Sequence, residues 1–204
     1  FIIRPMNTIS VNNSYAPQSF GTVPVKTVSK HRVRNYNRDI SKADKTKALI
    51  LCSPSNPTGS VYTKEELAGL AAVLAKHPQV YVIADEIYEH INYIGAHQSI
   101  AQFPEMKERT VIVNGVSKAY AMTGWRIGFI AGPEWIVKAV NKLQGQYTSG
   151  PCSVSQKAAE AAYTGTQAPV EEMRQAFQRR RDLVGRLRPD GDNIVLAFLV
   201  RQEA

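Results

Sequence analysis

The sequence predicts an α/β fold built on a mainly parallel sheet, because short apolar runs alternate with longer segments of helical periodicity. A chain of 204 residues can form one medium domain and the start of another. Its 44% hydrophobic and 21% charged residues are ordinary globular values, which argues against disorder of the whole chain. Four apolar runs are expected to form strands: residues 48–52, 80–84, 110–113 and 127–132.

The first predicted strand leads into the first predicted helix. Residues 48–52 form a continuous apolar run that a Ser-Pro pair stops, as expected for a strand buried on both faces. Thr63 and Glu66 have the spacing of a capping box, which opens a helix that ends near Pro78. The apolar positions of this helix share one face: Leu67, Leu70, Ala71 and Leu74.

Further helices are expected over three segments: about 134–146, 153–163 and 169–187.

Polar residues that could bind a ligand or take part in catalysis follow the predicted strands. In parallel α/β sheets, ligands bind beyond the carboxyl ends of the strands. Asp85 directly follows one strand, Lys118 follows another, and Asn56 lies in the loop after the first. Their placement alone indicates a binding site at this edge of the sheet.

The net charge of +8 and the two cysteines bear on the partners and the compartment. The positive residues are mostly scattered, and the dense run Arg179–Arg181 is typical of a solvated helix face rather than a nucleic-acid footprint. Cys52 and Cys152 lack metal-ligand spacing, so we expect two buried thiols in a reducing compartment. No apolar run reaches the length of about 18 residues that spans a bilayer, and no signal-peptide pattern opens the chain. We therefore expect a cytoplasmic protein without nucleic-acid, membrane or metal binding.

Three motifs in order carry a resemblance to a known family: residues 53–59 (SPSNPTG), 84–88 (ADEIY) and 113–128 (VNGVSKAYAMTGWRIG). Together they resemble the class I/II aminotransferases with pyridoxal phosphate, closest to the bacterial-type aspartate and aromatic branch. The resemblance extends from about residue 47 to about residue 183. It implies the three-layer large domain of the fold-type I transferases, incomplete at both ends. It also implies a homodimer that moves an amino group between an L-amino acid, with aspartate or an aromatic one as candidates, and a 2-oxo acid.

The resemblance assigns the central chemistry to Lys118 and Asp85. A lysine amine can form a Schiff base with the cofactor aldehyde and later shuttle the α-proton of the substrate. A carboxylate beside the pyridine nitrogen keeps that nitrogen protonated, so that the ring can accept electrons. Considered without the motifs, Lys118 would be a surface lysine and Asp85 a strand-end cap.

Four further residues are assigned to the cofactor by the resemblance. Tyr88, which is also counted as catalytic, and Asn56 contact the ring oxygen. Arg126 holds the phosphate with its guanidinium fork, and Ser117 adds a hydroxyl near the phosphate or beside the lysine. Considered without the motifs, Tyr88 would be a packed aromatic and Asn56 a turn former.

Both ends of the chain depart from the family pattern. We expect a partial cofactor-binding large domain over residues 1–187, divergent over 1–46, and a divergent stub over 188–204 where the small domain would begin. Residues 5–8 lack the aromatic that stacks on the cofactor ring, and the arginine that binds the substrate carboxylate has no counterpart. We therefore expect a fragment with weak or no activity. A non-catalytic regulator domain, an inactive remnant, and a lyase or decarboxylase on the same scaffold stay open as alternatives.

Overall fold

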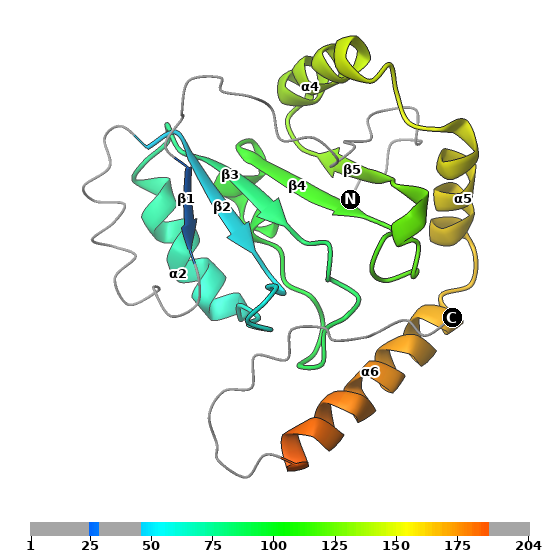
Figure 1. Cartoon of the computed structure of the whole chain (residues 1–204). Coiled ribbons are helices and arrows are strands. Elements are labelled where there is room, and N and C mark those ends of the chain that lie inside the picture. Colours follow the sequence, from blue (N-terminus) through cyan, green and yellow to red (C-terminus); the bar gives the residue numbers. More distant parts are fainter. Residues whose placement is uncertain (1–24, 29–45, 188–204) are drawn as a thin grey trace.

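The computed structural model describes residues 25–28 and 46–187 (Figure 1). Five strands form one sheet in the order β1-β2-β3-β4-β5. Their bounds are Val25–Val28 (β1), Ala48–Cys52 (β2), Tyr81–Asp85 (β3), Thr110–Gly115 (β4) and Gly128–Ala131 (β5). The first four strands run parallel to one another, and β5 runs antiparallel to β4. The predicted α/β class with a mainly parallel sheet is confirmed.

The helices begin and end close to the predicted positions. Their bounds are Lys64–Ala75 (α2), Ile100–Gln102 (η2), Pro104–Lys107 (α3), Thr123–Trp125 (η3), Glu134–Tyr147 (α4), Ser153–Thr164 (α5) and Ala168–Leu187 (α6). Figure 1 shows α2 beside β1 and β2, whereas α4 and α5 lie toward β5 at the opposite edge of the sheet. Within the part of the chain that is described, no helix is both long and apolar enough to cross a membrane.

Strand β1 was not expected, because it lies in the segment that the sequence pattern left without clear periodicity. It pairs in parallel with β2, with Val25 opposite Ala48 and Val28 opposite Leu51. The expectations for residues 5–8 and for the stub over 188–204 lie outside the described residues. The same holds for most of the segment 1–46.

The core lies between one face of the sheet and α2. Alternate residues of β2 and β3 are buried on this face: Leu49, Leu51, Val82 and Ala84. They pack in one cluster with buried residues of α2, η2 and α3: Leu67, Leu70, Ala71, Leu74, Ile100 and Met106. The other residues of β2 and β3 are half-buried. On that second face Tyr81 contacts Trp135 of α4, with ring centroids 5.6 Å apart. The expectation that β2 is buried on both faces is therefore met on one face only among the described residues.

The capping box of α2 provides a first test of this fold. Thr63 Oγ1 accepts a hydrogen bond from Glu66 N at 3.2 Å, and Glu66 Oε2 accepts one from Thr63 N at 2.9 Å. We expect Thr63→Ala to lower the free energy of unfolding by about 1 kcal/mol, because an amide at the helix N-terminus loses its acceptor. Urea unfolding followed by circular dichroism measures this change. Thr63→Ser should retain the cap, and an unchanged midpoint for Thr63→Ala would contradict the prediction.

Candidate functional site

Three predicted site residues meet beyond the carboxyl ends of β2, β3 and β4. Asn56, in the loop after β2, donates a hydrogen bond from Nδ2 to Tyr88 Oη at 3.2 Å. The Lys118 Nζ lies 5.6 Å from the centroid of the Tyr88 ring. Tyr88 is 8% exposed, Lys118 is half-buried and Asn56 is exposed. An amide, a phenol and an amine therefore converge at the edge where the parallel strands end.

Asp85 is the last residue of β3, opposite Cys52 of β2 and Val113 of β4. Its Oδ1 accepts a hydrogen bond from Ile87 N at 3.2 Å, which is the local turn role that strand-end aspartates commonly have. Its Oδ2 lies 3.9 Å from Cys52 Sγ. The half-buried carboxylate is thus held at the same strand ends as the Asn56–Tyr88–Lys118 group.

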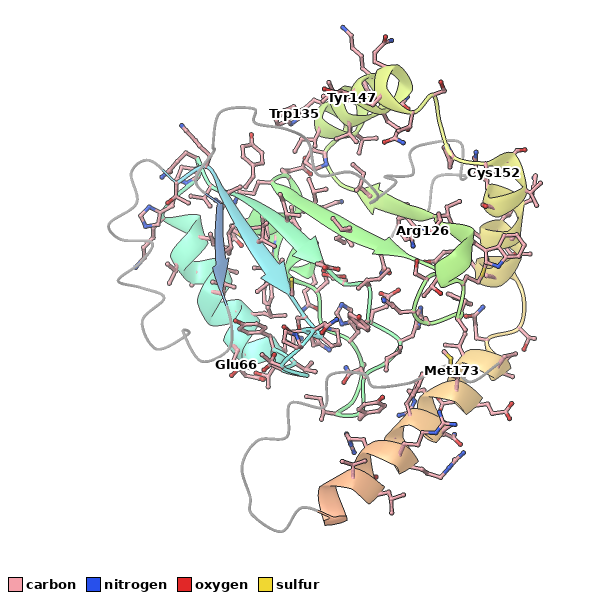
Figure 2. The ribbon with its side chains drawn as sticks, in the orientation of Figure 1. Glu66, Arg126, Trp135, Tyr147, Cys152 and Met173 are labelled. Carbon is pink, nitrogen blue, oxygen red and sulfur yellow. The ribbon has the colours of Figure 1, made fainter. Side chains whose placement is uncertain are left out.

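Ser117 and Arg126 flank this group along the chain. Ser117 is half-buried directly before Lys118, and Arg126 is exposed at the end of η3, where its Nη1 donates to Thr123 O at 3.0 Å. Arg126 has φ 50° and ψ 52°, a left-handed conformation that L side chains seldom adopt and that is frequent at functional sites. Figure 2 labels this side chain, and the pairing of Gly128 with Gly115 puts it beside the carboxyl end of β4. No described contact joins Arg126 to Lys118.

The close approach of β4 and β5 explains one glycine before the lysine. A Cβ on Gly115 would lie 2.9 Å from the Cα of Gly128 and 3.0 Å from Ile127 O. Both contacts are with backbone atoms, so a larger residue would push the strands apart. Gly115 therefore fixes the path of the chain that leads into Ser117 and Lys118.

A second polar cluster lies on the segment that carries Tyr88. Glu86 is 5% exposed, and ligand atoms of Glu86, Glu89 and His97 lie within 4.8 Å of one another, close enough for a metal ion to be considered. The spacing of these residues matches no metal motif, and only the loop between them brings them together. Burial opposes ionisation of Glu89, but a hydrogen bond and charge from His90, charge from His97 and a hydrogen bond from Asn114 prevail and lower its pKa. The expected absence of a metal stays a prediction.

A cavity among the described residues lies next to this cluster. Its volume is about 690 Å³, and it is lined by the segment 89–97 together with residues of α6. Two of the lining residues, Glu171 and Arg174, form an ion pair at 2.7 Å within one turn of α6. None of the six predicted site residues lines the cavity.

The two cysteines differ in exposure, which corrects one expectation. Cys52 is half-buried, but Cys152 is exposed before α5 rather than buried (Figure 2). Burial raises the pKa of the Cys52 thiol, and the charge of Asp85 raises it further. Hydrogen bonds from the backbone of Ser155 and Val154 lower the pKa of Cys152. The sequence could not reveal this difference in exposure, because the exposure of Cys152 depends on the path of the connection between α4 and α5.

This difference predicts selective alkylation. At neutral pH, we expect iodoacetamide to modify Cys152 at least about tenfold faster than Cys52. The thiolate is the nucleophile, and the Cys152 thiol deprotonates at a lower pH than the Cys52 thiol. Mass spectrometry after timed alkylation measures both rates. As the pH rises, the rate at Cys152 should increase first and that at Cys52 later. Cys52→Ser and Cys152→Ser variants identify the peptides, and equal rates would contradict the prediction.

Comparison with known families gives a match over most of the chain. The family described as aminotransferase class I and II matches residues 19–189. The aspartate aminotransferase of Geobacillus stearothermophilus is 55% identical over 142 residues, which cover 69% of this chain and 36% of that protein. A probable aspartate/prephenate aminotransferase of Rhizobium leguminosarum bv. phaseoli is 47% identical over 165 residues, which cover 78% of this chain and 41% of that protein. The chain thus spans well under half the length of these relatives.

Solved structures give the same result for the fold. The aspartate aminotransferase from Rhizobium meliloti matches with a TM-score of 0.70 and 45% identity, over 74% of this chain and 38% of that chain. The aspartate aminotransferase from Thermus thermophilus with maleate matches with a TM-score of 0.70 and 42% identity, over 76% of this chain and 40% of that chain. These are proteins of the class that the three sequence motifs resemble.

Proposed function

This chain belongs to the class I and II aminotransferases, which depend on pyridoxal 5'-phosphate, and we propose that it binds this cofactor through Lys118 and carries part of the machinery for amino-group transfer. The observation that carries the proposal is the meeting of Asn56, Tyr88 and Lys118 from three different strand ends. Chance would rarely bring an amide, a phenol and an amine together at the edge where parallel sheets bind ligands.

The donor set fits the cofactor. Pyridoxal phosphate offers an aldehyde, a ring oxygen, a ring nitrogen and a phosphate. Lys118 supplies the amine for the aldehyde, and the N–H of Asn56 and the O–H of Tyr88 are donors for the ring oxygen. Asp85 supplies a carboxylate for the protonated ring nitrogen. The guanidinium fork of Arg126 suits phosphate oxygens.

The remaining proposed roles concern Ser117 and the two groups that would hold or move a proton, Lys118 and Asp85. Ser117 adds a hydroxyl beside Lys118, near the phosphate or the amine. When bound, the cofactor supplies an electron sink for the charge left when the substrate α-proton departs. Lys118 Nζ would take that proton from the substrate α-carbon and pass it on to a different carbon rather than return it, which requires the neutral amine. Asp85 holds a proton on the ring nitrogen, and Asn56 with Tyr88 keeps the ring in one orientation.

We infer L-aspartate as the amino donor and a 2-oxo acid as the acceptor. Two relatives that are 55% identical to this chain carry the name aspartate aminotransferase, which supports this choice. We also propose that the protein forms a homodimer and is located in the cytoplasm. We propose further that residues 1–187 form part of its cofactor-binding large domain.

The proposal is tested by adding pyridoxal phosphate to the purified chain and reducing it with borohydride. Mass spectrometry of the peptides should find the reduced cofactor on Lys118. An adduct on exposed lysines alone would overturn the cofactor assignment. Addition of L-aspartate to the loaded chain before reduction then tests amino transfer, since conversion should release the cofactor from Lys118. A stable adduct that aspartate leaves unchanged would favour the inactive remnant or the regulator domain.

A further inference from the structure

Glu86 is a buried carboxylate between two proposed site residues, Asp85 and Tyr88. It is 5% exposed, and each of its oxygens lies close to a polar side chain on the segment that follows. Ser99 Oγ donates a hydrogen bond to Glu86 Oε1 at 2.6 Å. His97 Nε2 lies 3.0 Å from Glu86 Oε2, a charge contact without the alignment of a hydrogen bond. A buried carboxylate costs free energy unless it is paired, so this arrangement stabilises one position of the Glu86 side chain.

The backbone of Glu86 marks the point where β3 passes into the turn that carries Tyr88. Glu86 N donates to Val113 O at 3.0 Å, which extends the pairing of β3 with β4. Glu86 O accepts from Glu89 N at 2.9 Å, and Tyr88 O accepts from Ile91 N at 2.8 Å. Anchoring the Glu86 side chain therefore fixes the direction in which the chain leaves the strand.

Ser99, the hydrogen-bond partner of Glu86, is itself held in place. Ser99 Oγ accepts from Ala101 N at 3.2 Å, which caps η2, and the η2 residue Ile100 is 1% exposed in the core. Glu86 thereby ties the Tyr88 turn to a rigid part of the fold. Hydrogen-bonded buried networks of this kind rigidify a single arrangement. Functional groups must be held to within about 0.5 Å of the productive geometry, and supporting contacts supply that accuracy.

We propose that Glu86 is a positioning residue for the cofactor site, which acts by holding the turn that orients Tyr88 toward Asn56. This inference rests on the proposed function. Glu86 itself faces Ser99 and His97 rather than the Asn56–Tyr88–Lys118 group. Its effect on cofactor binding therefore passes through Tyr88.

The first test uses the full chain without cofactor. Glu86→Ala should speed hydrogen exchange at the amides of Glu89 and Ile91 by about tenfold, because a paired buried carboxylate is lost. Exchange along β2 should stay unchanged. Glu86→Gln keeps an oxygen that Ser99 can donate to, so the exchange rates at Glu89 and Ile91 should lie between those of the unmodified chain and those of Glu86→Ala. Unchanged exchange at Glu89 and Ile91 would overturn the proposal, whatever the chain does with cofactor.

The second test is a double-mutant cycle on the affinity for pyridoxal phosphate. Tyr88→Phe alone should weaken binding by about tenfold, because one hydrogen bond to a charged oxygen is lost. In the Glu86→Ala background the same change should add little, since Tyr88 is already misplaced. Leu70→Ala, a core substitution, serves as the control for general destabilisation, and its effect should be additive with Tyr88→Phe. Additive effects of Glu86→Ala and Tyr88→Phe would overturn the proposal, whereas failure of the unmodified chain to trap cofactor on Lys118 would overturn the proposed function.

Discussion

Replacing Lys118 with alanine is expected to abolish the specific borohydride-trapped cofactor adduct. Lys118 is half-buried beside the Tyr88 ring, whereas Lys64, Lys107 and Lys138 are exposed. An exposed lysine can also react with the cofactor aldehyde, but it has no neighbouring residues that would hold the cofactor ring, so its adduct should form in low yield. We therefore expect complete loss of the Lys118 adduct, with only the low background of the exposed amines left. Peptide mapping after reduction measures both.

Lys118→Arg is the matched variant for this prediction. It keeps a cation near the Tyr88 ring, but the guanidinium stays protonated in proteins and cannot condense with an aldehyde. It should therefore lose the adduct as completely as Lys118→Ala. Lys142→Ala, at an exposed position on α4, should leave the yield unchanged. Circular dichroism checks that each variant is folded, and an adduct that survives in Lys118→Ala would refute the assignment.

The elements that could be predicted are those whose signals are local. The apolar run of β2 and the capping box at Thr63 gave the bounds of β2 and α2 almost to the residue. The placement of Asn56, Asp85 and Lys118 after successive strands followed from the rule that parallel strands share one carboxyl edge. Their actual contacts, such as the Asn56–Tyr88 hydrogen bond, needed the structure because they depend on loop conformation.

The direction of β5 follows from what its link to β4 contains rather than from the length of that link. The 12 residues 116–127 contain only the short η3, whereas parallel strands are usually joined by a crossover with an α-helix. A link without such a helix favours the antiparallel return that the structure has. Strand β1 could not be deduced, because a strand of four residues is too short to show a period.

Long-range partnerships of polar residues stayed hidden for a different reason. Glu86 has no signal of its own within its motif, because Asp85 and Tyr88 account for the chemistry there. His97 and Ser99 gave no signal, since their pairing with Glu86 depends on the path of the loop between them. The sequence pattern therefore identifies residues that face a ligand more readily than residues that hold those residues in place.

Replacing Arg109 with methionine is expected to cause a large loss of stability. Arg109 is 8% exposed, and its guanidinium joins three backbone carbonyls, one on α3 and two in the loop between α2 and β3. Its Nε donates to Glu105 O at 3.0 Å, and its Nη1 donates to His77 O at 2.8 Å and to Val80 O at 3.4 Å. Burial lowers the pKa of this guanidinium, which Glu105 partly offsets, but the group stays charged. It therefore links α3 to the loop between α2 and β3.

Arg109→Met keeps much of the apolar volume but removes three hydrogen bonds from a charged donor, although His77 O still accepts from Val80 N at 3.0 Å. We expect the free energy of unfolding to fall by about 3 kcal/mol, since a hydrogen bond to a charged group contributes about 1.5–3 kcal/mol and the longest of the three, at 3.4 Å, contributes least. Lys107→Met, an exposed change on α3, should stay within about 0.5 kcal/mol. Arg109→Lys should be intermediate, because an ammonium cannot reproduce the fork. Urea unfolding decides the matter: if Arg109→Met and Lys107→Met lose equally little stability, the carbonyls do not depend on Arg109, and the junction of α2, β3 and α3 is held by apolar packing alone.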